Sequence, residues 1–233
     1  MKALHPFIAF AMLGVTAGVH AGGDSGAVLL NANFNDEPID QPIGAGGPEL
    51  GQPISVFPGL SAIVRTGPMA TPSLEISEAV GGSAFAARFE FLDGEEVTHG
   101  DLNIHMHIEA PQFDTFEVNV REPGSSAQVF ASVIFTGFGG IVASDQAGSI
   151  GTIGSYSINV AYELGILFHM DEGTYDIKLN GAPVISGRAH GVTARGIGAV
   201  MVGTGTLTTP GTLFYVDRLR VTRGDGIFRN GFD

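Results

Sequence analysis

Alternation of apolar and polar residues with a period of two is the feature that most constrains how this chain folds. Residues 102–109 (LNIHMHIE) and 115–121 (TFEVNVR) are the sharpest examples. Successive side chains of a strand point to opposite faces, so each run has one apolar and one polar face. Comparable runs recur along the chain between Gly, Pro, Asn and Asp, and no segment after residue 21 has the period of an amphipathic helix. The pattern predicts an all-β fold of short antiparallel strands.

The same pattern gives approximate strand positions. We expect that residues 102–109 and 115–121 pair as a hairpin, because only a short link separates them. Asn180-Gly181 predicts a two-residue hairpin turn, since both residue types tolerate positive φ. A Gly/Pro-rich loop is expected over residues 35–53, and a Gly/Ser-rich stretch over 139–155. The expected strands are 27–34, 73–77, 84–91, 102–109, 115–121, 127–135, 156–162, 165–170, 175–179, 184–185, 196–202 and 213–221.

The first 21 residues have the features of a secretory signal peptide. Lys2 provides a positive start, residues 6–19 (PFIAFAMLGVTAGV) form a short apolar run, and Val19-His20-Ala21 offers small residues at a cleavage site. The apolar run is shorter than the roughly 20 residues that cross a bilayer. We therefore expect a secreted or extracytoplasmic protein with no stable membrane span. Removing 21 of 233 residues leaves 212, a length that suits one large all-β domain.

Composition excludes several classes of function. The chain has no cysteine, which removes thiol nucleophiles and cysteine zinc sites and means that no disulfide supports the core. It has 24 acidic against 11 basic residues, a formal net charge of −13. A phosphate backbone or an anionic membrane surface would be repelled, so nucleic acid is not an expected partner.

The order of features resembles the concanavalin A-like lectin/glucanase superfamily, and within it the laminin-G-like modules. The resemblance rests on residues 33–36 (NFND), the hairpin 167–185 (LFHMDEGTYDIKLNGAPVI) and the closing strand 214–221 (FYVDRLRV), and it covers about residues 27–223. It implies a jelly-roll β-sandwich of two antiparallel sheets, one of them concave. Residues 227–233 (IFRNGFD) resemble a short tail found on many exported proteins of Gram-negative bacteria. The expected organisation is a signal peptide over 1–21, a sandwich domain over 22–223 and a tail over 224–233.

The polar face of the expected 102–121 hairpin is the leading candidate for a ligand site. Imidazoles, amides and carboxylates suit sugar hydroxyls, which both donate and accept hydrogen bonds. A solvated face of an ordinary antiparallel sheet gives the same alternation. The candidate ligand-binding residues are Asn103, His105, His107, Glu109, Glu117, Asn119 and Arg121.

The sequence suggests two candidate metal sites. His105 and His107 project from one face of a strand, and a metal would need a third ligand there, such as Glu109 or Glu117. The family resemblance implies a separate structural calcium near both ends of the domain. Its candidate ligands are Asp36 and Asp217, with Asn33 or Glu37 nearby in sequence. The alternative is that Asp36 caps a turn and Asp217 pairs with an arginine.

Catalysis is not expected. The glucanase branch of the superfamily carries Glu-x-Asp-x-x-Glu and the lyase branches carry Arg-rich and Gln-x-His strands, and none of these occurs here. Glu109 and Glu117 would face each other across the expected hairpin, but no second acid lies two residues from either. The chain also lacks Trp and has only four Tyr, so it has few rings on which a sugar could stack.

Three functions stay open from the sequence. The first is an exported, non-catalytic module that binds carbohydrate or another extracellular surface ligand through a concave polar face. The second is a structural or adhesive surface protein with no small-ligand site. The third is a divergent polysaccharide-cleaving enzyme.

Overall fold

The computed structural model describes residues 26–44, 50–51, 54–78, 85–124, 128–192, 195–205 and 209–224. The expected signal peptide lies outside these residues, as does the expected C-terminal tail after Gly224. No helix among the described residues is long and apolar enough to cross a membrane.

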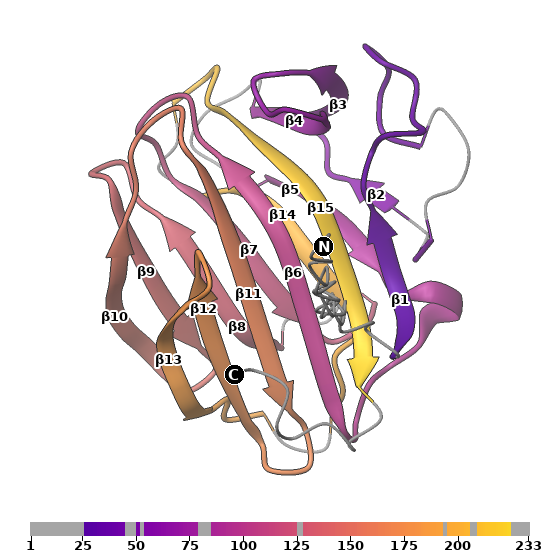
Figure 1. The fold of residues 1–233 in the computed structure, drawn as a ribbon, viewed down its shortest axis with the longest axis vertical. Coiled ribbons are helices and arrows are strands. Elements are labelled where there is room, and N and C mark those ends of the chain that lie inside the picture. The colour runs from indigo at the N-terminus through magenta and orange to yellow at the C-terminus, as the bar shows by residue number, and fades with distance from the viewer. Residues whose placement is uncertain are drawn as a thin grey trace, which may run out of the picture.

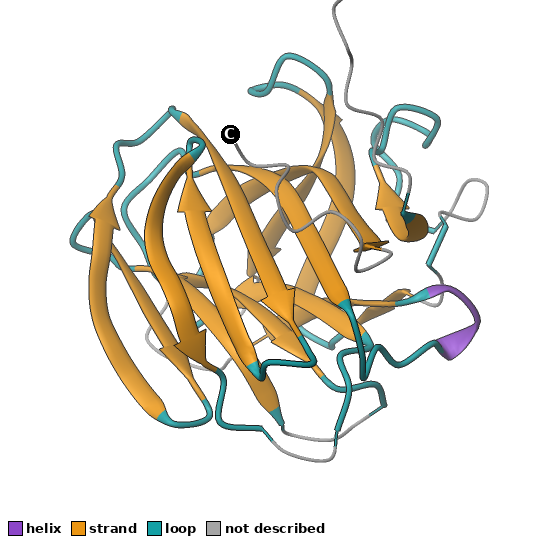
Figure 2. Cartoon of the chain, turned by 60° about the horizontal axis from the view of Figure 1, so that its bottom comes forward, coloured by secondary structure: helices purple, strands orange, loops and turns teal. Residues whose placement is uncertain are grey.

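Two antiparallel sheets face each other across one core, which confirms the predicted all-β sandwich (Figure 1). The front sheet has the order β13 (Ala182–Ala189), β12 (Thr174–Leu179), β11 (Ala161–His169), β6 (Asp101–Glu109), β15 (Leu213–Gly224), β4 (Pro72–Glu78) and β3 (Leu60–Thr66), and β1 (Ala27–Ala32) also pairs with β15. The back sheet has the order β10 (Gly148–Ser155), β9 (Gly140–Asp145), β8 (Val129–Phe135), β7 (Phe116–Arg121), β14 (Ala199–Thr204), β5 (Phe85–Glu90) and β2 (Ile54–Val56). In the described residues the helical structure is one 3-10 turn at Leu92–Gly94, and loops join the strands at both ends of the sandwich (Figure 2).

The core consists of the apolar faces of both sheets, as the alternation predicts. Phe116 of β7 stacks on Phe135 of β8 and on Phe214 of β15, with ring centroids 4.6 and 4.8 Å apart. All three rings are buried, and burial of a side chain of this size contributes roughly 1.5–3 kcal/mol. Because Phe214 belongs to the front sheet, this stack joins the two layers.

One polar contact also joins the sheets. Asp145 at the end of β9 is buried and accepts hydrogen bonds from the Tyr175 hydroxyl (3.1 Å) and from Arg188 Nε (2.9 Å). Tyr175 lies on β12 and Arg188 on β13, so a carboxylate of the back sheet holds two strands of the front sheet. Burial, followed by the neighbouring Asp145 carboxylate, raises the pKa of Tyr175. Tyr175 is fully buried, as expected for a core residue.

The predicted pairing of residues 102–109 with 115–121 is wrong. β6 pairs with β11 and β15, whereas β7 pairs with β8 and β14. The link between them crosses from the front sheet to the back sheet, and the Tyr156 hydroxyl donates a hydrogen bond to the backbone oxygen of Asp114 in this link (3.2 Å). Each strand therefore turns its apolar face toward the other across the core, and the polar faces point in opposite directions. Alternation specifies the two faces of a strand but not its neighbours.

The Asn180-Gly181 turn is confirmed. Leu179 pairs with Ala182, so β12 and β13 are joined by two residues, with φ of 50° at Asn180 and 76° at Gly181. Both angles lie in the left-handed region that this turn type requires.

Candidate functional site

The seven predicted ligand-binding residues fall into two groups on opposite outer faces of the sandwich. Asn103, His105, His107 and Glu109 lie on the outer face of β6 in the front sheet. Glu117, Asn119 and Arg121 lie on the outer face of β7 in the back sheet. The seven residues thus cannot contact one compact ligand, and the expected facing of Glu109 and Glu117 is wrong.

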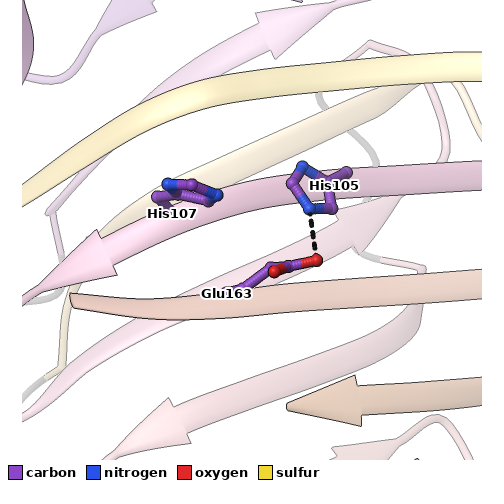
Figure 3. A group of neighbouring side chains, drawn as sticks. All are labelled: His105, His107 and Glu163. Carbon is purple, nitrogen blue, oxygen red and sulfur yellow. Dashed lines mark hydrogen bonds and ion pairs between the residues drawn. The ribbon is translucent and has the colours of Figure 1, made fainter. Parts of the chain in front are cut away.

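The front-sheet group gains a carboxylate from the neighbouring strand. In the register of β6 and β11, Glu163 lies opposite His107, and its Oε1 is 2.8 Å from Nε2 of His105 (Figure 3). The His105 and His107 rings are 5.4 Å apart, centroid to centroid, in an edge-to-face arrangement. An ionised carboxylate only accepts hydrogen bonds, so His105 is the donor. We call these three residues the His105 cluster.

A small pocket lies beside the His105 cluster on the same face. Its volume is about 90 Å³. Gly165 leaves the space open, since a Cβ there would meet only the Lys178 side chain at ordinary contact distance, 3.8 Å. The pocket combines donors and acceptors with short apolar surfaces. It is lined by Asn103, His105, Glu163, Gly165, Ile166, Leu167, Asp176, Lys178 and Gly181.

A bulge in β15 borders the cluster on its other side. Asp217 lies opposite His107 and Arg220 opposite His105, with the bulge between them. Arg218 in the bulge has a φ of 53°, a region that residues other than glycine rarely adopt. Bulges re-aim side chains and occur often near functional sites. Here the bulge leaves the Arg218 side chain about half exposed while its neighbour Asp217 is buried.

Charges around the cluster shift two pKa values. Partial burial, followed by electrostatic interactions with His105 and Arg218, lowers the pKa of His107, although Glu163 and Asp217 oppose this shift. The hydrogen bond from His105 lowers the pKa of Glu163. His107 is therefore neutral and Glu163 ionised at neutral pH. At the end of β6, burial raises the pKa of Glu109.

The back-sheet residues are held by their own neighbours. Asn119 Nδ2 donates a hydrogen bond to Glu117 Oε1 (3.0 Å), and Arg121 Nη1 lies 3.1 Å from the sulfur of Met201. Burial raises the pKa of Glu117 and lowers that of Arg121. The core of the sandwich lies between this group and the His105 cluster.

The residues proposed for calcium have different surroundings. Asp217 accepts hydrogen bonds from the Thr71 hydroxyl and from the backbone N–H of Arg218 (2.7 Å), and Arg218 Nε is 3.6 Å from it. Asp36 is exposed, whereas the adjacent Glu37 is buried and its Oε2 has no hydrogen-bond partner among the residues that the structure describes. Such a buried oxygen suits a hard cation, but Asp217 is already paired as the alternative interpretation expected. The calcium site stays a prediction.

Sequence reasoning missed three side chains of the front-sheet site. Glu163, Asp176 and Lys178 belong to β11 and β12, and their polar positions alternate with buried ones. That alternation is readable from the sequence and marks each residue as outward-facing. The alternation does not show that β11 pairs with β6, or in which register.

Comparisons with known proteins identify the fold. No family model matches the sequence, and no curated protein matches it. Among solved structures, a sialidase matches at 10% identity over 74% of this chain and 17% of its own length, with a TM-score of 0.58. A carbohydrate esterase from Shiga toxin-encoding bacteriophage phi24B matches at 12% identity over 86% of this chain and 100% of its own, with a TM-score of 0.56.

The globular domain of T. cruzi calreticulin is a third neighbour, at 8% identity over 84% of this chain and 88% of its own, with a TM-score of 0.54. Identities this low show a shared fold alone. The chain spans less than a fifth of the sialidase, so that protein's activity does not transfer with the fold. The fold and the site together define an antiparallel β-sandwich with a small pocket, bordered by polar side chains, on the outer face of one sheet.

Proposed function

We propose that this protein is an exported, non-catalytic β-sandwich of the concanavalin A-like superfamily that binds carbohydrate in the pocket beside the His105 cluster. The single observation that carries the proposal is the set of five polar side chains among the residues that line the pocket. An amide, an imidazole, two carboxylates and an ammonium group surround a space that Gly165 leaves open.

The chemistry of the lining supports a polyhydroxylated ligand. Sugar hydroxyls donate and accept, so they can use the carboxylate of Asp176 as an acceptor and the ammonium group of Lys178 as a donor. Lys178 is one of only two lysines in the sequence, and the other, Lys2, lies in the expected signal peptide. Leu167, on the outer face of β11, adds a short apolar surface, as small-ligand sites usually do.

The pocket also sets a limit on affinity. Among the described residues that line it, the only ring is that of His105. Hydrogen bonds without a stacking platform exchange protein–water for protein–sugar contacts and give a modest net gain per bond. We therefore propose weak recognition of one or two sugar units. The fold neighbours include a carbohydrate esterase and a sialidase, and we use them only to choose carbohydrate among hydroxylated ligands.

A glycan array tests the proposal with the mature protein. Gly165→Leu should abolish binding because its side chain fills the pocket, and Asn103→Ala and Lys178→Ala should each weaken it. Asn119→Ala is the matched control, because it removes an amide from the outer face of the opposite sheet. The proposal is wrong if Gly165→Leu binds glycans as the wild type does, or if the wild type binds none.

An adhesive role is the second candidate, and a separate observation favours it. Three large apolar side chains are exposed on loops at the ends of strands: Phe113, Phe138 and Ile158, of which Phe138 is 100% exposed. Exposed apolar groups that gather into a patch mark sites of protein association. Self-association that Phe138→Ser removes, in a protein with no glycan binding, would favour this role.

A further inference from the structure

The His105 cluster has the donor set of a transition-metal site. Two imidazoles and one carboxylate place their ligand atoms within 4.8 Å of one another, and they form the only such group of three among the described residues. His105 and His107 are two residues apart on β6, so the strand itself aims both rings to one side. Glu163 reaches them from β11, and the two strands are fixed to each other by a continuous ladder of nine residue pairs.

Small side-chain movements would complete the coordination geometry. Zinc bonds of about 2.0–2.1 Å place neighbouring ligand atoms of a tetrahedral site about 3.3 Å apart. His105 Nε2 and Glu163 Oε1 are already 2.8 Å apart, so a metal would replace the proton between them. The side chains of His105 and Glu163 are 37% and 49% exposed, which leaves both free to adjust their torsions.

The donor types select the metal. Calcium and magnesium prefer six or more oxygen ligands, whereas imidazole nitrogen suits zinc, copper, nickel and cobalt. Two histidines and a glutamate match zinc sites that have three protein ligands and one open position. The exposure of His105 and Glu163 places that open position toward solvent and the neighbouring pocket.

Surrounding charges allow a cation here. Arg218 and Arg220 lie beside the cluster on β15, and Arg218 Nε is 3.6 Å from the buried carboxylate of Asp217. Asp217 is also the cross-strand neighbour of His107. The carboxylate of Asp217 therefore offsets part of the positive charge that the two arginines bring to the cluster.

We propose that His105, His107 and Glu163 together bind one divalent transition-metal ion of the zinc class, with its remaining coordination position open to solvent. This site shares His105 and Glu163 with the lining of the proposed carbohydrate pocket, but it does not depend on carbohydrate binding. The sequence suggested Glu109 or Glu117 as the third ligand, and the structure replaces them with Glu163.

Isothermal titration with ZnCl2 tests the site on untagged, chelator-washed mature protein. The wild type should bind one zinc ion per chain with a single saturable isotherm. His105→Ala, His107→Ala and Glu163→Gln should each weaken zinc binding by at least about tenfold. Even the loss of a residue that only hydrogen-bonds to a metal ligand typically weakens metal binding by that factor. Binding of Co²⁺ should give the intense visible absorption of a four-coordinate site, and these three variants should lose it.

His99→Ala is the matched control. His99 Nδ1 is 3.1 Å from Asp171 Oδ1, so it is another exposed histidine–carboxylate pair, but no third ligand joins it among the described residues. Zinc binding should be unchanged in this variant, and circular dichroism should show that all variants fold. The proposal is overturned if the wild type gives no saturable isotherm, or if all three cluster variants bind zinc as tightly as the wild type does. Glycan binding that persists after chelation would support the proposed carbohydrate pocket, whatever the result with zinc.

Discussion

Replacing Asp145 with alanine tests how the two sheets are held together at the β9–β12–β13 corner. In the wild type its carboxylate accepts from the Tyr175 hydroxyl, from Arg188 Nε and from the backbone N–H of Ala147 (2.8 Å). Alanine removes all three hydrogen bonds at once. The Tyr175 hydroxyl then has no partner from Asp145, although the ring stays fully buried.

The expected loss of stability can be added up from these contacts. An orphaned buried hydroxyl costs about 1–3 kcal/mol, and the turn hydrogen bond from Ala147 contributes about 0.5–1.5 kcal/mol. The Arg188 side chain is 38% exposed, so solvent screening leaves its ion pair with Asp145 out of this sum. The sum of the other two contributions is about 1.5–4.5 kcal/mol, and at about 2–4 °C per kcal/mol for a domain of this size the melting temperature should fall by about 3–18 °C.

Thermal and urea unfolding of the variants measure this loss. Tyr175→Phe alone should cost less, about 0.5–1.5 kcal/mol, because it leaves Asp145 paired with Arg188. The double variant Asp145→Ala/Tyr175→Phe should lose less stability than the two single variants lose together, since no buried hydroxyl then lacks its acceptor. An Asp145→Ala protein within 1 kcal/mol of the wild type, or strict additivity in the double variant, would refute this account of the corner.

Three further predictions use other parts of the structure. Phe116→Ala should cost about 3–5 kcal/mol in chemical unfolding, because it empties the middle of the stack with Phe135 and Phe214; a loss below 1 kcal/mol would contradict that packing. Burial lowers the pKa of His169, but its contacts with Asp101 and Asp176 outweigh this and raise it above 6.5. The stabilisation that His169 contributes is therefore complete below the unfolded-state pKa and is lost as pH rises through the folded-state pKa. The free energy of unfolding of the wild type minus that of His169→Gln should increase from pH 8 to pH 6. A difference that does not change with pH would count against this reasoning. A melting temperature that falls with EGTA, but not with a zinc-selective chelator, would support the predicted calcium, and no response to EGTA would remove it.

The strands that sequence reasoning located well are those with clear alternation. Residues 102–109 and 115–121 coincide closely with β6 and β7, because a half-buried strand must alternate. Strands β9 and β10 fall in the Gly/Ser-rich stretch 139–155, where glycines obscure the period. Residues 156–162 were expected as a strand, but β11 begins only at Ala161, and Tyr156 instead caps the core at a loop.

The candidate site was predictable only in part, for a related reason. The outward direction of His105 and His107 follows from local alternation, so the sequence was enough to select them. Their partner Glu163 is more than fifty residues away in the chain and reaches them through the β6–β11 register. Such non-local pairing depends on how all the strands pack together, and no single strand contains it.

The position of β15 has a consequence for biosynthesis. This last described strand lies between β6 and β4 and also pairs with β1, the first described strand. The front sheet therefore cannot close until residue 224 has emerged from the ribosome. Until then β4 and β6 keep unpaired edges that invite contacts with other chains. The last strand to be synthesised therefore protects the middle of the front sheet from aggregation.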